Sequence, residues 1–192
     1  YNSKMLKLFY CDISSSNLNI NNVNIISKKR VDYVNSITDL KRKSQSIFAW
    51  ALLEKVLIDN QINFESNSFF LKENGKWTLD GVYFSLSHSD NIVCVLISDE
   101  CDVGVDVQLV SKKLLKIKDK FSIKEDDLDK IALCWTEYES KLKSNEAKIY
   151  SSFTINDENK NKYYITACAG QTIDKIIEVS ANQLLIKGVK YE

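Results

Sequence analysis

The chain has 192 residues with 26 Lys and Arg against 26 Asp and Glu, so its formal net charge is zero. This balance argues against a general nucleic-acid binder, which carries a basic excess, and leaves any anionic ligand to local lysines and arginines. A hydrophobic content of 44% is ordinary for a folded protein of one domain or two small ones.

The first half of the chain predicts a strand, a helix and then further strands. Residues 5–13 have the pattern of a strand, and a basic cluster follows at residues 28–30. Apolar residues at helical spacing predict a long helix over about 40–59. After a short strand at 69–71 and a turn at 73–76, the chain predicts three consecutive strands at 82–87, 92–98 and 103–109.

The second half follows the same plan more loosely. Ser122 and Glu125 have the spacing of a capping box, which predicts a helix from there to about Lys143. Further strands are expected near 149–155, 162–168, 173–179 and 184–187, with a hairpin turn at 156–161. We therefore predict an α+β fold of two similar halves, 1–100 and 101–192, related by a pseudo-twofold axis. Each half is expected to pack a long helix on a small antiparallel sheet.

The five cysteines are scattered, odd in number and free of any CxxC pair, and no signal-like segment is evident at the N-terminus. This pattern is typical of reduced, buried thiols, so we expect a cytoplasmic protein. No apolar run reaches membrane-spanning length, so no membrane contact is expected. A single histidine and no clustered cysteines argue against structural zinc.

Residues 103–108, VGVDVQ, place a carboxylate inside a valine strand. Because side chains alternate in a strand, the valines share the core face, and Gly104, Asp106 and Gln108 share the other. Carboxylate and amide oxygens side by side suit Mg²⁺, and Gly104 is expected to leave room for a ligand. The same pattern is also typical of an edge strand whose Asp and Gln are simply solvated.

Residues 135–143, WTEYESKLK, place Trp135, Glu139 and Lys143 on one stripe of a helix. Glu139 and Lys143 at this spacing can be an exposed ion pair, which contributes only about 0.2–0.5 kcal/mol. A Trp on the same stripe indicates partial burial, which makes Glu139 a candidate for metal binding and proton transfer.

The run FSLSHS at 84–89 holds the only histidine, His88, between Ser87 and Ser89. Hydroxyls and backbone amides at the end of a strand can hold an oxyanion. A hydrolase triad of Ser87, His88 and Asp106 is disfavoured, because the G-x-S-x-G elbow is absent and adjacent strand residues point to opposite faces.

The order of Gly75-Lys76, FSLSHS, VGVDVQ and WTEYESKLK resembles the 4′-phosphopantetheinyl transferases of the surfactin-synthetase type. The resemblance covers about residues 28–155. It implies a monomer of two α+β halves with coenzyme A bound in the cleft between them. It also implies transfer of the phosphopantetheine arm to a serine of an acyl or peptidyl carrier protein, with 3′,5′-ADP as the other product.

The resemblance further implies that Asp106 and Glu139 bind Mg²⁺, or Mn²⁺, on the diphosphate. Gln108 stands where the family often has Glu, and can offer an uncharged oxygen to the metal. Glu139 would act as base toward the carrier serine, and Lys143 would neutralise charge on the phosphates.

The coenzyme A contacts implied by the resemblance are Lys76, Ser87 and His88, with His88 at the 3′-phosphate. Lys29 and Arg30 are carried over from a more weakly aligned region. An acidic helical carrier protein would dock on the lysine-rich residues 112–120.

Three positions depart from the family pattern: Gln108, Trp77 in place of a proline, and Tyr138 in place of a lysine. Two alternatives to a transferase stay open, and Gln108 and Tyr138 motivate the first. One is a non-catalytic relative that binds coenzyme A or a carrier. The other is an unrelated Mg²⁺-dependent phosphohydrolase that uses Asp106 and Glu139.

Overall fold

The computed structural model describes residues 5–15, 19–73, 75–145 and 147–185. Its strands are β1 (Leu6–Asp12), β2 (Phe69–Leu71), β3 (Trp77–Leu79), β4 (Tyr83–Ser89), β5 (Ile92–Ser98), β6 (Gly104–Leu109), β7 (Ile149–Asn156), β8 (Lys162–Ala169) and β9 (Ile176–Glu178). Its helices are α1 (Lys28–Asn35), α2 (Leu40–Asp59) and α3 (Leu128–Lys143). Three 3-10 helices complete the chain: η1 (Ile20–Asn22), η2 (Lys112–Phe121) and η3 (Ala181–Leu184).

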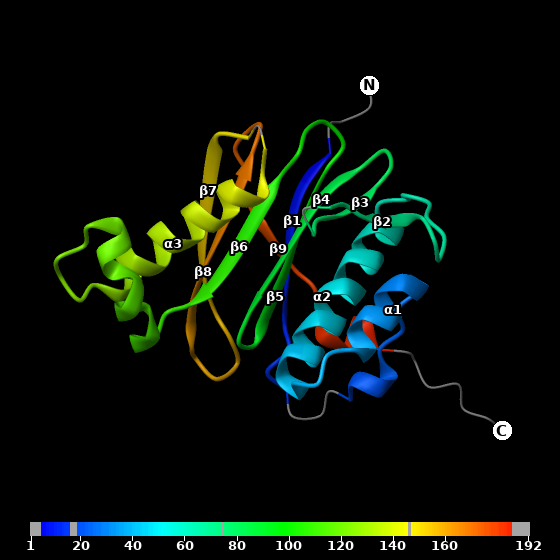
Figure 1. The fold of residues 1–192 in the computed structure, drawn as a ribbon, viewed down its shortest axis with the longest axis horizontal. Helices are drawn as coiled ribbons and strands as arrows, with labels where there is room; N and C mark the ends of the chain where they lie inside the picture. The colour runs from blue at the N-terminus through cyan, green and yellow to red at the C-terminus, as the bar shows by residue number, and fades with distance from the viewer. Residues whose placement is uncertain (1–4, 16–18, 74, 146, 186–192) are drawn as a thin grey trace.

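Two larger sheets form the middle of the molecule, with α2 on one side and α3 on the other (Figure 1). The first has the strand order β4-β5-β1-β9 and the second β6-β8-β7, while β2 and β3 pair separately. All pairings are antiparallel except that of β9 with β1. The fold is therefore α+β, as predicted. Because β9 pairs with β1, residues 176–178 lie beside the N-terminal strand.

Two main cores flank the first sheet, since β5 is a continuous apolar run that is buried on both faces. One face of β5 packs with α2, whose Phe48 and Trp50 are almost fully buried. The other face packs with β6 and β8, where Val105 and Val107 lie. The layers are thus helix, sheet, sheet and helix, and the division at residue 100 remains a prediction.

Most predicted elements form close to where the sequence placed them. The helix α2 matches the expected range, and Asp39 caps it by accepting a hydrogen bond from the Arg42 amide. The hairpin between β7 and β8 turns at residues 157–161. None of the helices in the described ranges combines the length and apolarity needed to cross a bilayer.

The predicted capping box at Ser122 and Glu125 is wrong. Ser122 adopts a left-handed conformation, with φ of 55°, and terminates η2. An N-cap needs an extended backbone, which Ser122 therefore cannot supply. Asp127 caps α3 instead, accepting a hydrogen bond from the Lys130 amide at 3.0 Å.

The last two predicted strands also need correction. The strand expected at 173–179 is reduced to β9. The strand expected at 184–187 does not begin at Leu184, because that residue ends η3. Leu185 makes a single bridge to Val23, and residues 186–187 lie outside the described part. Ala181 and Leu184 are buried in the core beside α2, so a short helix and not a strand buries these apolar side chains.

All five cysteines are free thiols, as predicted. Cys11, Cys94 and Cys168 are buried, whereas Cys101 and Cys134 are partly exposed, so the expectation of burial holds for three. Burial raises the pKa of the Cys11 thiol to about 12, which keeps it protonated at neutral pH.

Candidate functional site

Three serines of β4 connect the two sheets. β4 and β6 are the edge strands that meet where the sheets join. Serine hydroxyls of β4 accept the backbone amide hydrogens of β6 in three successive pairs: Ser85 with Val105 at 3.1 Å, Ser87 with Val107 at 3.3 Å, and Ser89 with Leu109 at 3.0 Å. We call this set of three contacts the serine ladder. Side-chain hydroxyls thus replace the carbonyls of an ordinary sheet pairing.

Asp106 is buried at this seam, with 7% of its surface exposed. Its Oδ1 accepts hydrogen bonds from the Ser87 hydroxyl and from the Lys143 ammonium, each at 2.8 Å. Lys143 also donates to the Val105 carbonyl at 3.0 Å. Burial raises the pKa of Asp106, while Lys143 and Ser87 act in the opposite direction by stabilising the carboxylate. The solvated edge-strand alternative for Asp106 is therefore wrong.

Gly104 does not leave room for a ligand, contrary to the prediction. A Cβ added there would lie 1.9 Å from the backbone carbonyl oxygen of Ser140 in α3. The absent side chain therefore lets α3 pack directly on β6. This close approach brings Lys143, one turn further along α3, to Asp106.

Glu139 lies one helical turn before Lys143 on α3. The simple reading of this spacing, an ion pair between the two, is not found in the described residues, because the Lys143 ammonium is directed to Asp106. Glu139 is half-buried, and none of the described residues forms a hydrogen bond or ion pair with its carboxylate. The carboxylate is thus available beside the buried Asp106–Lys143 pair.

The few oxygen atoms near this pair are more typical of a Mg²⁺ site than of a metal whose ligands are all protein side chains. No three His, Cys, Asp or Glu side chains converge on a metal position anywhere in the described ranges. Mg²⁺ usually takes one or two carboxylates and completes its shell with phosphate oxygens and water. Asp106 and Glu139 each offer a carboxylate, but no contact joins the two carboxylates among the described residues, and their role as metal ligands remains a prediction. The amide nitrogen of Gln108 donates to the Leu109 carbonyl at 3.0 Å, and the ligand role of Gln108 remains a prediction.

His88 is exposed at the end of β4, near three cationic side chains. Its pKa lies below the ordinary value, first through desolvation and then through the charges of Lys143, Arg30 and Arg42. Since the imidazole keeps solvent contact, a bound anion can offset these charges. The sequence singled out all of these residues except Arg42 as binding or catalytic residues.

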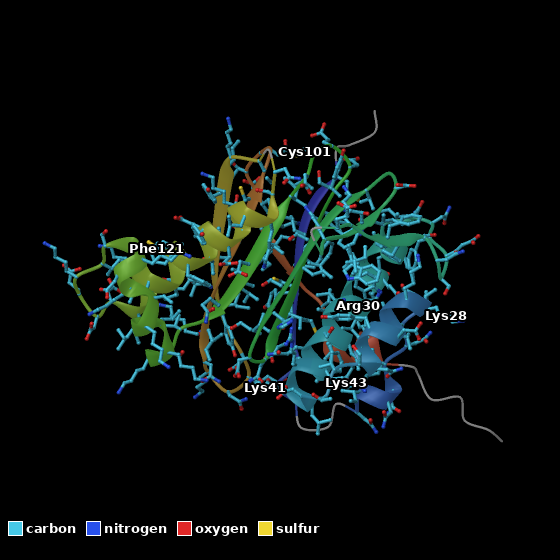
Figure 2. The ribbon with its side chains drawn as sticks, in the orientation of Figure 1. Lys28, Arg30, Lys41, Lys43, Cys101 and Phe121 are labelled. Carbon is cyan, nitrogen blue, oxygen red and sulfur yellow. The ribbon has the colours of Figure 1, made fainter. Side chains whose placement is uncertain are left out.

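Arg30 is enclosed by aromatic rings instead of carboxylates. Its guanidinium lies 4.6 Å from the ring centre of Tyr33 and 4.8 Å from that of Trp50, and its terminal nitrogen donates to Ser46 at 2.7 Å. The Nε atom is buried without a partner among the described residues. Burial lowers the pKa of Arg30 to about 10, so it stays charged at neutral pH. The predicted basic cluster at 28–30 forms the start of α1, which sequence analysis did not assign as a helix (Figure 2).

The side chains of Lys29 and Arg30 lie in different surroundings, because Lys29 is on the exposed surface of α1 and Arg30 is buried. It is exposed, and its ammonium lies 5.4 Å from the centre of the Phe70 ring. A shallow pocket of about 640 Å³ beside it is lined by both acidic and basic residues. The structure therefore does not bring Lys29 together with His88 and Arg30.

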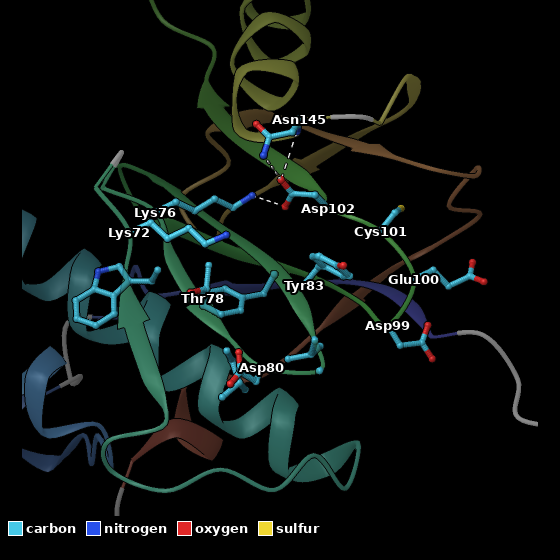
Figure 3. A pocket seen from close by; sticks show the side chains of 15 residues that line it. Lys72, Lys76, Thr78, Asp80, Tyr83, Asp99, Glu100, Cys101, Asp102 and Asn145 are labelled. Carbon is cyan, nitrogen blue, oxygen red and sulfur yellow. Dashed lines mark hydrogen bonds and ion pairs between the residues drawn. The ribbon is translucent and has the colours of Figure 1, made fainter.

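Lys76 connects the Gly-Lys turn to the start of β6 and the end of α3. Its ammonium pairs with Asp102 and donates to the Lys143 backbone carbonyl at 2.8 Å. Asn145 donates to the other Asp102 oxygen at 3.0 Å, which completes a polar bridge (Figure 3). Lys76 lines two pockets, of about 580 and 330 Å³, which also share Trp77, Phe84 and Asn145.

The lysine-rich segment forms η2, which packs against α3. Its Lys120 ammonium lies 3.7 Å from the ring centre of Tyr138 and 5.0 Å from that of Trp135. Phe121 contacts the same two rings edge-on. Tyr138, which departs from the family pattern, is thus engaged with η2.

Comparison with known proteins adds no family: no protein-family model matches the chain, and no curated protein matches it.

Proposed function

We propose that the protein is a 4′-phosphopantetheinyl transferase, active as a cytoplasmic monomer on coenzyme A and an acidic acyl or peptidyl carrier protein. The observation that carries this proposal is the buried Asp106–Lys143 pair, with Glu139, whose carboxylate has no partner among the described residues, one helical turn away. In this proposal the α2 and α3 layers belong to two halves related by a pseudo-twofold axis, and coenzyme A lies between them.

Phosphoryl transfer is mostly a matter of positioning and charge neutralisation. The carrier serine oxygen forms a bond to the β-phosphorus of coenzyme A, and the bond from that phosphorus to 3′,5′-ADP breaks. Glu139 takes the serine proton, directly or through water. Lys143 would neutralise charge on the phosphates. Asp106 and Glu139 would hold a divalent cation, which supplies polarisation of the diphosphate.

The charges around His88 support a phosphate subsite. Desolvation is the first cause that lowers the pKa of His88, and the charges of Lys143, Arg30 and Arg42 lower it further. No carboxylate is among the groups that shift the pKa of Arg30. A dianionic phosphate placed among these groups would offset their mutual repulsion. We assign the 3′-phosphate of coenzyme A to this position, with Arg30 acting mainly through its charge.

The decisive test is intact-mass spectrometry of apo carrier proteins incubated with the protein, coenzyme A and Mg²⁺. The expected result is the mass gain of one phosphopantetheine, lost in EDTA. Release of nucleotide or phosphate from coenzyme A without an acceptor would favour the phosphohydrolase alternative. Coenzyme A binding without any gain, across acyl and peptidyl carriers, would favour a non-catalytic relative. The engagement of Tyr138 with Lys120 is the observation that keeps this second candidate open.

His88→Ala is expected to weaken coenzyme A binding in a pH-dependent way. In the free protein the pKa of His88 is below its ordinary value, so the ring is neutral at pH 7. A bound phosphate raises that pKa, so affinity should rise as pH falls from the pKa of the complex to that of the free protein. The measurement is calorimetric titration of both forms between pH 5 and 8.

The quantity to compare is the difference in coenzyme A binding free energy between wild type and His88→Ala at each pH. The 3′-phosphate ionises in the same way with both proteins, so its contribution cancels. Coenzyme A lacking the 3′-phosphate is the matched ligand control, and it should bind the two forms equally at every pH. An unchanged affinity of His88→Ala for coenzyme A would remove His88 from the subsite.

Reversing the charges of Lys112, Lys113 and Lys116 to Glu is expected to raise the KM for the carrier protein and leave that for coenzyme A unchanged. Opposite surface charges mainly speed association, so the effect should be largest at low salt and shrink toward 0.5 M. Steady-state kinetics at several ionic strengths measure it. Lys160→Glu on the β7–β8 hairpin is the matched control, and a salt-independent or absent effect of the triple change would reject η2 as the docking surface.

A further inference from the structure

The one hydrogen that the Ser87 hydroxyl can donate is already used within the protein. A serine has one hydrogen to donate and two lone pairs to accept with. Ser87 donates its hydrogen to Asp106 Oδ1 at 2.8 Å and accepts the Val107 amide at 3.3 Å. Its side chain is 7% exposed, so little of it faces solvent. This arrangement disagrees with the coenzyme A contact that the family resemblance implies for Ser87.

We infer that Ser87 is a positioning residue that fixes the Asp106 carboxylate for a divalent cation and does not contact coenzyme A. The role in cation binding rests on the proposed transferase function. That Ser87 holds the Asp106 carboxylate in place can be tested without assuming that function. Ser87 and Lys143 both bond to Oδ1, from β4 and from α3. Oδ2 takes neither bond, and it is the oxygen we assign to the cation.

Two donors from different elements hold the carboxylate more firmly than either alone. Asp106 stands on an extended strand, where more than one χ1 rotamer is common. Lys143 reaches the carboxylate by a long, flexible side chain that is itself 31% exposed. Ser87 reaches it from a short side chain on a paired strand. Ser87 is therefore the more rigid of the two constraints.

The serine ladder supplies its own controls. Ser85 and Ser89 accept the amides of Val105 and Leu109 as Ser87 accepts that of Val107. Neither Ser85 nor Ser89 bonds to Asp106 in the described residues. Alanine at any of the three positions leaves one β6 amide without its hydroxyl, so all should lower the melting temperature. Only Ser87→Ala should alter Asp106.

The first experiment needs no ligand. The ¹⁵N signal of the Lys143 side-chain ammonium, assigned with a Lys143→Arg variant, reports whether Asp106 stays in place. We expect that signal to shift or broaden in Ser87→Ala, to stay unchanged in Ser85→Ala and to recover in Ser87→Thr, which restores a hydroxyl. An unchanged Lys143 signal in Ser87→Ala would overturn the positioning role.

The second experiment measures coenzyme A binding by calorimetry in EDTA and in Mg²⁺. In EDTA, Ser87→Ala and Ser85→Ala should bind coenzyme A equally. In Mg²⁺, Ser87→Ala should lose about 10- to 100-fold of the metal-dependent affinity, as other residues that orient a metal ligand do. Equal weakening of Ser87→Ala in EDTA and Mg²⁺ would show a direct contact and overturn the inference.

Failure of the proposed function looks different from failure of this inference. If wild-type protein binds no coenzyme A, the transferase proposal fails, and the Lys143 signal still decides the positioning role. If wild type binds and transfers but Ser87→Ala matches Ser85→Ala in both experiments, only the inference about Ser87 fails.

Discussion

Replacing Glu139 with Gln is expected to lower kcat for phosphopantetheine transfer by about 10²- to 10⁴-fold, the range typical for loss of a general acid–base group. The change should leave the melting temperature unaltered, because the carboxylate makes no hydrogen bond or ion pair within the described part of the chain. Affinity for coenzyme A in EDTA should also stay the same. Intact-mass assays under single-turnover conditions measure the rate.

Glu137→Gln is the matched control, since Glu137 lies on the same helix, two residues away and therefore on another face. It should retain wild-type kcat. Full activity in Glu139→Gln would remove Glu139 as base and metal ligand and leave Asp106 alone at the site. An equal loss in both variants would point to a general effect of charge on α3.

The alternation of apolar and polar residues with a period of two made the strand that carries Asp106 predictable. Val105 and Val107 lie in the core between the sheets, as their alternation with Asp106 required. The period of α3 likewise predicted that Lys143 belongs to a partly buried stripe. Neither pattern could show that the ammonium of Lys143 meets Asp106 and not Glu139, because that choice depends on where α3 lies across β6.

Contacts between segments far apart in the chain account for what the sequence missed. The alternating serines of FSLSHS were a readable signal of a polar stripe, yet their partners are 20 residues away on another sheet. The capping box failed because η2 ends at Ser122 in a left-handed turn that local pattern did not reveal. The enclosure of Arg30 by Trp50 and Tyr33 needed the packing of α1 on α2.

Gly104→Ala is expected to destabilise the protein by about 1–3 kcal/mol or more, the range for overpacking a filled core. The new methyl group would lie 1.9 Å from the Ser140 carbonyl and 3.0 Å from the Ser144 amide nitrogen. Both are backbone atoms of α3 or its end, so no side chain can rotate away and α3 itself has to move. Urea unfolding followed by circular dichroism measures the loss.

Gly170→Ala is the matched control, since there the nearest atom to an added Cβ is the Cys101 sulfur at 3.0 Å, which belongs to a side chain that can rotate. It should cost much less than Gly104→Ala. Because Lys143 follows Ser140 on α3, a displaced helix also withdraws the ammonium from Asp106, so Gly104→Ala should lose transfer activity even where it remains folded. Wild-type stability and activity in Gly104→Ala would mean that α3 is not seated on β6 by this contact, and the Asp106–Lys143 pair would need another explanation.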